Sequence, residues 1–146
     1  MFKRIMGKAF DKAVNEYIQR KDKMFSETFR NVLTHNGVVS ITTWANNQAH
    51  VANTWNVYLQ ITDDNRILIP AAWLKKTEAN IALNNKVIVT LGSPDVQGTI
   101  GMGTGFCIEG TVKFLDSGKE FDMMKGKFSF LTRVLEITPT NVKQTI

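Results

Sequence analysis

Two lysines and a threonine lie together at the expected start of a short helix, and their chemistry suits an anion. The segment PAAWLKKTEANIALNN, residues 70–85, predicts an apolar strand end, a turn and a helix that begins at Thr77. Thr77 is a suitable N-cap residue, and Asn80 completes a weak capping box. Unpaired N–H groups at a helix start attract anions, and Lys75 and Lys76 add full positive charges. This stretch alone leaves two interpretations open, solvated lysines or a phosphate-binding site.

A second segment combines amide side chains with aromatic rings. In ANTWNVY, residues 52–58, an extended chain directs Asn53 and Trp55 to one face and Thr54 and Tyr58 to the other. Strand interiors usually avoid asparagine, so we expect polar partners for the two asparagines of this motif. Aromatic walls, amide donors and a nearby anion site fit a flat heteroaromatic ligand with a phosphate tail.

The other reactive residues lack the neighbours that catalysis requires. The glycine-rich run from Gly98 to Gly105 matches neither common phosphate-binding loop, because a strand follows it, and we interpret it as a hairpin connection. Cys107 has no histidine or second cysteine nearby, and the two histidines show no metal-ligand spacing. We therefore expect neither a metal site nor a hydrolase nucleophile, and we assign no catalytic residue.

Length and composition predict a globular protein with one core. The chain has 146 residues and is 43% hydrophobic, which suffices for one core but not for two ordinary domains. The longest apolar run, residues 67–74, is much shorter than the roughly 20 residues that cross a bilayer. The basic start is not followed by the apolar region of a secretory signal. These features predict a cytoplasmic protein.

Positive charge is concentrated at the N-terminus. Residues 1–23 hold seven Lys/Arg and three Asp/Glu, a net charge of +4, whereas the remaining chain holds eleven and ten, a net charge of +1. The nearly neutral remainder argues against a nucleic-acid-binding protein. We therefore divide the chain into an N-terminal amphipathic, basic helical extension, residues 1–23, and one domain, residues 24–146.

The apolar residues of the extension recur at helical spacing. They are Phe2, Ile5, Met6, Ala9, Phe10, Ala13, Val14, Tyr17 and Ile18. Such a stripe packs on the core, packs on a partner subunit, or lies on an anionic membrane. Packing is the favoured interpretation and membrane contact is the alternative.

From Gly37 onward the apolar period changes to two, which indicates strands. The strand patterns cover residues 37–44, 50–61, 66–72, 86–93, 106–114 and 131–138. The turn between the first two strands is predicted at the Ala-Asn-Asn-Gln sequence. Ser26 is expected to cap a helix before the strands, and Ser117 and Glu120 to form a capping box for a later one. Several strands with few helices favour an antiparallel barrel or sandwich.

Four sequence blocks together resemble one family. VANTWNVYL, DDNRILIP, KTEANIALNNKVIVTLGS and GTGFCIEGTVKF, in this order, resemble the small bacterial FMN-binding proteins of the pyridoxamine 5′-phosphate oxidase-like family. The resemblance covers about residues 25–146. It implies a mainly β fold, the FMN-binding split barrel of antiparallel Greek-key type, and a homodimer with FMN bound where the two subunits meet.

The resemblance also implies which residues bind the cofactor. Lys76 and Thr77 match the lysine-threonine pair of the family and would hold the FMN phosphate. Phe130 and the terminal Ile146 would approach the isoalloxazine ring from the second subunit. The full implied set is Asn53, Thr54, Trp55, Tyr58, Trp73, Leu74, Lys76, Thr77, Phe130 and Ile146.

The function implied by this resemblance is that of an FMN-binding redox or electron-transfer protein with an unknown redox partner. An NAD(P)H-dependent flavin reductase, or another oxidoreductase of the split-barrel family, is the enzymatic alternative. A membrane-peripheral module that uses the basic extension is the other alternative. Pyridoxamine 5′-phosphate oxidase activity is not expected, because the chain lacks the arginine-rich phosphate strand and the C-terminal Arg-x-His pair of those enzymes.

Overall fold

The computed structural model describes residues 7–15 and 24–146. The strands are β1 (Val38–Ala45), β2 (Gln48–Trp55), β3 (Gln60–Ile61), β4 (Ile67–Ala71), β5 (Lys86–Gln97), β6 (Met102–Leu115) and β7 (Arg133–Gln144). The helices are one over residues 7–15, α2 (Glu27–Val32), the short 3₁₀ helix η1 (Asn56–Tyr58), α3 (Lys75–Leu83) and α4 (Lys119–Lys127).

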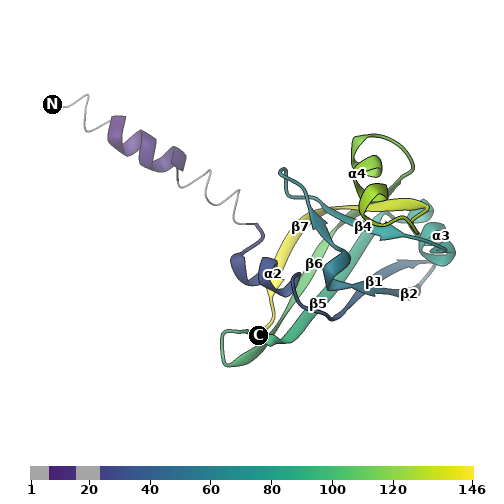
Figure 1. The fold of residues 1–146 in the computed structure, drawn as a ribbon, viewed down its shortest axis with the longest axis horizontal. Coiled ribbons are helices and arrows are strands. Elements are labelled where there is room, and N and C mark those ends of the chain that lie inside the picture. Colours follow the sequence, from purple (N-terminus) through teal and green to yellow (C-terminus); the bar gives the residue numbers. More distant parts are fainter. Residues whose placement is uncertain (1–6, 16–23) are drawn as a thin grey trace.

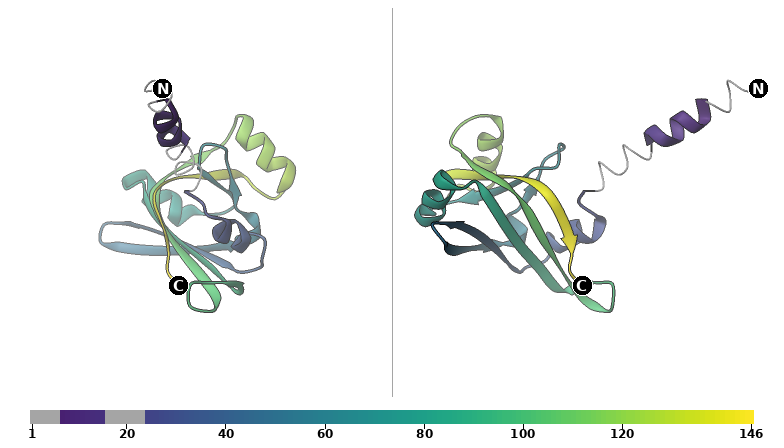
Figure 2. Two further views of the ribbon diagram at one scale, coloured as in Figure 1. Left: turned by 90° about the vertical axis from the view of Figure 1, so that its left-hand side faces the viewer. Right: turned by 180° about the vertical axis from the view of Figure 1, so that it is seen from behind.

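All seven strands belong to one sheet with the order β2-β1-β5-β6-β7-β4-β3. Each neighbouring pair is antiparallel. The sheet is strongly twisted and curls around its inner face (Figures 1 and 2). This architecture confirms the mainly β, antiparallel prediction.

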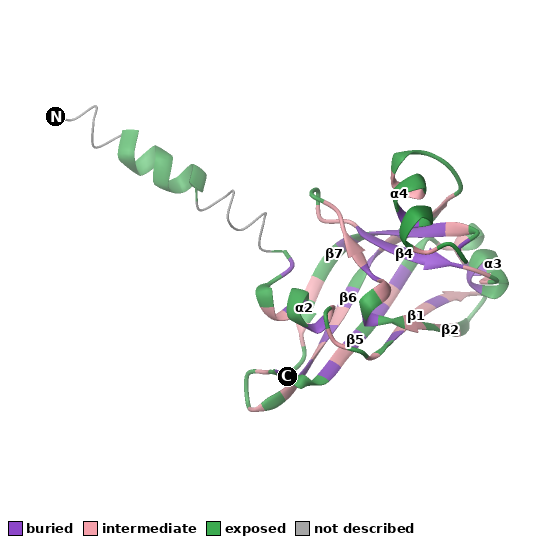
Figure 3. Ribbon diagram, viewed as in Figure 1, coloured by how far each residue is buried: buried purple, intermediate pink, exposed green. Residues whose placement is uncertain are grey.

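The core fills the inside of the curled sheet, and two helices close its ends. In β5, the buried Val87, Val89 and Leu91 alternate with more exposed residues, as expected for a strand with one buried face (Figure 3). Helix α2 brings Phe29 against Phe106, with ring centroids 5.1 Å apart. Helix α3 lies at the opposite end of the sheet from α2 (Figure 1).

Strand β4 is buried on both faces, which explains its uninterrupted apolar sequence. Ile67 and Ile69 belong to the main core, whereas Leu68 points to the other face of the sheet. There Leu68 belongs to a second apolar cluster with Met124 of α4 and with Leu131. Helix α4 therefore covers the part of the sheet formed by β4 and β7.

An arginine beside β4 links three separate segments. The Arg66 guanidinium forms ion pairs with Asp64 at 2.9 Å, with Glu136 at 2.6 Å and with Glu120. These contacts lower the pKa of Asp64 from 3.8 to about 2, mainly through the Arg66 hydrogen bond, and they also lower the pKa of Glu120. The predicted Ser117–Glu120 capping box is wrong, because α4 begins after Gly118 and the Glu120 carboxylate binds Arg66 instead.

Two local predictions are confirmed. The Phe29 N–H donates to Ser26 Oγ at 3.1 Å, so Ser26 caps α2 as expected. The β1–β2 hairpin turns at Asn46 and Asn47, which both have positive φ angles, 53° and 60°. Two successive left-handed residues are typical of the tight turn that matches the twist of a hairpin.

Several strand predictions differ from the structure at their ends. β5 continues to Gln97 and β6 begins at Met102, so only residues 98–101 of the predicted glycine-rich connection lie between the two strands. The strand predicted over residues 50–61 is interrupted, because η1 follows directly after Trp55. The last strand begins at Arg133 and continues to Gln144, beyond Pro139, instead of covering residues 131–138. Proline is tolerated there because the pairing with β6 shifts at a bulge between Glu109 and Gly110.

The helix over residues 7–15 exposes its side chains, including the large apolar ones (Figure 3). Phe10 is 69% exposed and Val14 is 37% exposed. These residues therefore do not pack on the core of their own protomer, and packing on a partner subunit, the other form of the favoured interpretation, stays a prediction; the rest of the extension lies outside the described residues. Within the parts of the chain that the structure describes, no helix has the length and apolar character needed to cross a membrane.

Candidate functional site

Several predicted site residues line a single pocket of about 170 Å³, which we call the aromatic pocket. It lies where the end of β2, η1, the segment after β4 and the loop after α4 come together, and Ile41 and Ile69 form part of its apolar lining. The predicted residues that it contains are Asn53, Thr54, Trp55, Tyr58, Leu74 and Phe130. These residues come from distant parts of the sequence.

Tyr58 and Phe130 line the aromatic pocket, and Phe128 packs against both rings. The ring centroid of Tyr58 lies 5.2 Å from that of Phe128 and 5.6 Å from that of Phe130. These separations are typical of favourable aromatic pairs. Phe130 is 51% exposed and Trp55 is 50% exposed, so both keep ring surface available for a planar ligand.

A buried asparagine sets the position of Tyr58. The Asn56 N–H donates to Gly37 O at 2.9 Å, and its Nδ2 donates to Gly92 O at 2.9 Å. Asn56 is fully buried, whereas Asn53 is exposed at the aromatic pocket. The two asparagines of the motif therefore differ in role, because Asn56 fixes the η1 turn. The alternation of faces predicted for residues 52–58 ends at Trp55.

Helix α3 begins earlier than predicted. Its N-cap is Leu74 and its first residue is Lys75, so the prediction of Thr77 as N-cap is wrong. The chain reverses at Trp73, which has a φ of 61°, and the Lys75 N–H donates to Trp73 O at 2.9 Å. Asn80 faces the core and donates to Thr43 Oγ1 at 3.2 Å, so it does not form the predicted capping box.

The start of α3 presents several donors to an anion. We call residues 73–77 the lysine turn. Leu74 provides no side-chain acceptor for the first N–H groups of the helix. Lys75 and Lys76 are exposed beside them. Among the described residues, the fully buried Thr77 Oγ1 finds no hydrogen-bond partner, and an unsatisfied buried hydroxyl costs about 1–3 kcal/mol.

Glu78, the acidic residue in the first turn of α3, forms an ion pair with Arg133 of β7. Glu78 accepts two hydrogen bonds from Arg133, at 2.9 and 3.1 Å, which lower the pKa of the carboxyl group. The Arg133 guanidinium also lies 4.0 Å from the ring centroid of Phe114. Because Glu78 is paired, its charge opposes an anion at the lysine turn less strongly.

The remaining predicted residues lie outside the aromatic pocket. Trp73 is 84% exposed and, with Lys76 and Thr77, belongs to the lysine turn directly after the segment that lines the pocket. Ile146 is not among the residues that line the pocket, and its backbone oxygen accepts from Thr104 Oγ1 of β6 at 2.6 Å; the C-terminus is marked in Figure 1. Its side chain is 55% exposed.

Phe130 and Ile146 therefore differ in their relation to the aromatic pocket. The resemblance implied that both approach the ligand from a second subunit. Phe130 lines the pocket of its own protomer beside Tyr58, so no second subunit is needed to place it there. Ile146, in contrast, does not line the pocket of its own protomer.

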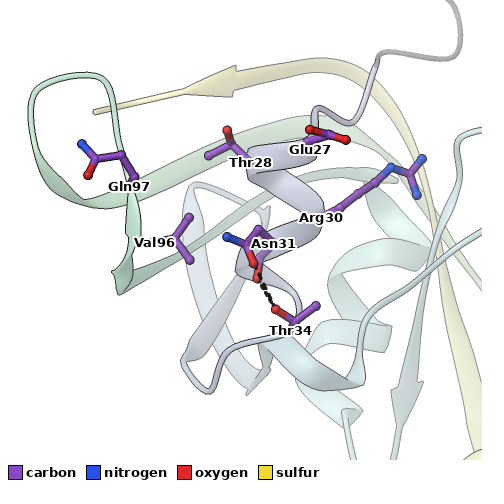
Figure 4. A pocket seen from close by; sticks show the side chains of 7 residues that line it. All are labelled: Glu27, Thr28, Arg30, Asn31, Thr34, Val96 and Gln97. Carbon is purple, nitrogen blue, oxygen red and sulfur yellow. Dashed lines mark hydrogen bonds between the residues drawn. The ribbon is translucent and has the colours of Figure 1, made fainter.

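A larger hollow, of about 530 Å³, lies between α2 and the end of β5 (Figure 4). Its lining residues are Glu27, Thr28, Arg30, Asn31, Thr34, Val96 and Gln97. They are all aliphatic or polar, and the Arg30 side chain points away from Val96 and Gln97 (Figure 4). This composition suits solvent better than a planar ligand, so we place the candidate site at the aromatic pocket and the lysine turn.

The described titratable residues do not suggest a metal centre. Within residues 7–15 and 24–146, no three His, Cys, Asp or Glu side chains are grouped closely enough to hold a metal ion. Cys107 is half-buried on the outer side of β6. The site can therefore bind an anionic, planar molecule, but it presents no obvious acid, base or nucleophile of its own.

Comparisons with known proteins agree with this description. Residues 25–146 match the family described as pyridoxamine 5′-phosphate oxidase. A protein named FMN-binding protein, from Nitratidesulfovibrio vulgaris (strain Miyazaki F), is 42% identical over 123 residues, which are 84% of this chain and 100% of that protein. The family match begins at residue 25 and therefore leaves the extension, residues 1–23, uncovered.

Solved structures with the same fold have much lower sequence identity. An FMN-binding protein from Syntrophomonas wolfei has a TM-score of 0.68 at 16% identity, over 94% of this chain and 97% of the other. A variant of HupZ from Group A Streptococcus has a TM-score of 0.64 at 15% identity, over 82% and 98% of the two chains. These similarities confirm the predicted split-barrel fold. By the match over residues 25–146 and the 42% identity to a full-length relative, this chain belongs to the pyridoxamine 5′-phosphate oxidase-like family.

Proposed function

We propose that this protein binds FMN and acts as a dimeric redox or electron-transfer protein. The observation that carries the proposal is the position of the lysine turn, with its unsatisfied Thr77 hydroxyl, beside a pocket walled by aromatic rings. The 42% identity to a protein named FMN-binding protein, over the whole length of that protein, supports the same ligand.

The phosphate of FMN would bind at the lysine turn. A phosphate monoester carries a charge of about −1.5 to −2 at neutral pH and has three acceptor oxygens. Lys76 would supply an ammonium group, Thr77 a hydroxyl, and the start of α3 its unpaired N–H groups. In support, no side chain caps the start of α3, and the Thr77 hydroxyl has no hydrogen-bond partner among the described residues.

The isoalloxazine ring would lie in the aromatic pocket, against Trp55, Tyr58 and Phe130. Asn53 and Thr54 would contact its polar edge or the ribityl chain, and Trp73 and Leu74 would border it. FMN supplies the redox chemistry when it is bound, and the protein orients the ring and excludes water from it. We assign no catalytic side chain.

A second subunit would complete the site. The aromatic pocket, at about 170 Å³, is smaller than the about 300–1,000 Å³ usual for small-molecule sites. The side chain of Ile146 is exposed and does not line the pocket of its own protomer, so it is available to a partner copy. The outer sides of β1, β5 and β6 carry the half-buried Thr42, Ile88 and Cys107, a surface of suitable character for a two-fold interface.

The direct test is the absorption spectrum of the purified protein. We expect a yellow protein with a flavin band, stoichiometric uptake of FMN by the flavin-free form, and a dimer by light scattering. A colourless protein that fails to take up added FMN would refute the proposal. A monomer that binds FMN with full affinity would refute the dimeric site alone.

An oxidoreductase of the same family is the alternative to a passive carrier. Rapid mixing of the FMN-loaded protein with NADH or NADPH separates the two functions. Bleaching of the flavin faster than that of free FMN at the same concentrations would identify a reductase. Slow bleaching, together with rapid electron exchange with a small redox protein, would identify a carrier.

A second candidate function concerns the extension and is favoured by the exposed Phe10 and Val14 side chains. A basic helix with one apolar face can lie on an anionic membrane. The test is co-sedimentation with vesicles of phosphatidylserine and phosphatidylcholine, compared with vesicles of phosphatidylcholine alone. We expect binding to the anionic vesicles that is lost in Phe10→Asp and in a chain without residues 1–23. Equal binding by all three chains would refute it.

A further inference from the structure

The loop between α4 and β7 places Phe130 at the aromatic pocket. Lys125, in the last turn of α4, donates hydrogen bonds to this loop. Lys125 Nζ donates to Ser129 O at 2.8 Å and to Leu131 O at 2.6 Å. These two carbonyl groups belong to the residues directly before and after Phe130. One ammonium group therefore binds the backbone directly before and directly after Phe130.

The two ends of the loop are fixed independently of the lysine. At its start, the Phe128 N–H donates to Met124 O at 2.8 Å. At its end, Leu131 is fully buried, and the Thr132 N–H donates to Ala71 O at 2.9 Å. The short exposed segment between these points contains Phe130 and is the part that Lys125 restrains.

Burial does not hold the Phe130 ring in place. With 51% of the residue exposed, the ring has solvent on one side and Tyr58 and Phe128 on the other. The direction of an exposed side chain depends on its backbone, so a restraint on the neighbouring carbonyl groups also restrains the ring. A charged donor bound to two carbonyl oxygens is a stronger restraint than a neutral hydrogen bond.

We propose that Lys125 is a positioning residue for the candidate site, which keeps Phe130 in the orientation that receives the planar ring of the ligand. The consequence for ligand binding rests on the proposed function; the restraint of the loop does not. Without the ammonium group, both carbonyl groups turn to water and the segment samples other conformations. Phe130 is then away from Tyr58 for part of the time, and part of the binding free energy of the ligand is lost in ordering the loop.

A purely local role at the end of α4 is the competing explanation, and the helix provides a matched control for it. Lys127 lies in the same last turn, so it shares any favourable interaction with the helix C-terminus. Its Nζ donates to Gln60 Oε1 at 3.1 Å and not to the loop. Substitution of Lys127 therefore removes an equal charge from the same helix end without releasing Phe130.

The experiment compares Lys125→Met, Lys127→Met and Lys125→Arg with the full-length wild-type protein. Hydrogen exchange of the Leu131 amide, which donates to Phe128 O across the loop at 3.2 Å, should become faster in the flavin-free form of Lys125→Met alone. Affinities for FMN and for riboflavin should both fall by about 5- to 10-fold in Lys125→Met, and by less than about twofold in Lys127→Met. Lys125→Arg, which can donate to both carbonyl groups, should recover most of the loss.

The equal loss for the two flavins is the specific signature, because Phe130 contacts the ring and not the phosphate. A loss for FMN alone would mean that Lys125 attracts the phosphate, and it would overturn the proposal. Unchanged hydrogen exchange and unchanged affinities in Lys125→Met would also overturn it. If the wild-type protein binds no flavin, the proposed function fails, and the exchange measurement still decides whether Lys125 restrains the loop.

Discussion

Tyr58 and Phe130 face one another at the aromatic pocket, with ring centroids 5.6 Å apart. Tyr58 follows β2 on the turn η1, and Phe130 comes from the loop before β7. β2 and β7 are not neighbours in the sheet. The pocket therefore exists only when the sheet has curled, so ligand binding and the integrity of the barrel are expected to be coupled.

A substitution of Thr77 should change ligand affinity without lowering the stability of the fold, because its hydroxyl is unsatisfied. Thr77→Val keeps the shape of the side chain and removes a buried hydroxyl that has no partner among the described residues. The melting temperature of the flavin-free protein should stay the same or rise. FMN affinity should fall about tenfold, and riboflavin affinity should not change.

Calorimetric titration and thermal melts measure these effects. Lys76→Ala should give the same selective loss of FMN affinity, because it removes a charge that faces the phosphate. An equal loss of riboflavin and FMN affinity in either variant would show that the lysine turn does not hold the phosphate.

The proposed shared site predicts complementation between two variants that each bind FMN weakly. Lys76→Ala weakens the phosphate site of the protomer that carries it. In the second variant, Ile146→Asp disrupts the proposed contact between Ile146 of its protomer and the flavin ring bound by the other protomer. In a mixed dimer, one site carries both changes and the other carries neither. After unfolding and refolding of an equimolar mixture, about a quarter of all sites should regain tight FMN binding.

Titration of the mixture with FMN, compared with each variant alone, measures the recovery. A mixture of Lys76→Ala and Thr77→Val is the control, because both changes affect the same half of the site and no intact site can form. Absence of recovery in the first mixture would place Ile146 outside the site of the partner.

The two asparagines of the NTWN motif should respond differently to substitution. Asn56→Ala removes a buried hydrogen bond to Gly92 O and should destabilise the protein by about 1–3 kcal/mol. Asn53→Ala removes an exposed side chain and should leave the free energy of unfolding nearly unchanged while weakening FMN binding. Urea denaturation of the flavin-free proteins measures the first effect. A larger destabilisation by Asn53→Ala would contradict the assigned roles.

The Arg66 ion pairs predict a specific loss of stability in acid. The folded-state pKa of Asp64 is lowered to about 2 and that of Glu120 is also lowered, so their contribution to stability is fully present above their ordinary pKa values. It is lost as the pH falls from about 4 towards 2, through the folded-state pKa values. Arg66→Met should therefore be less stable than wild type at pH 6, and its stability should depend less on pH between 4 and 2.

Thermal melts at a series of pH values and constant ionic strength measure this difference. Arg133→Met, which breaks the exposed Glu78 pair, is a useful comparison because α3 is held by other contacts as well. Parallel pH profiles of wild type and Arg66→Met would show that these carboxylates do not contribute to acid stability.

Features that depend on neighbouring residues were predictable from the sequence. The alternation of apolar residues in β5 and β6, the Ser26 cap of α2 and the Asn46–Asn47 turn all follow from local geometry. The family and its fold were recognisable because whole motifs, with their spacing, occur in this chain. These predictions needed no knowledge of contacts between distant segments.

Several features of the site were decided only by the folded chain, because they depend on backbone reversals and contacts that the apolar spacing of the sequence does not specify. The Glu120 carboxylate has a stronger partner in Arg66 than in the start of its own helix. Helix α3 begins at Lys75 because the chain reverses at Trp73, and this buries Thr77 instead of making it the cap. Local spacing predicts a helix near Lys125, but only the folded chain places its ammonium group between the carbonyl groups that flank Phe130.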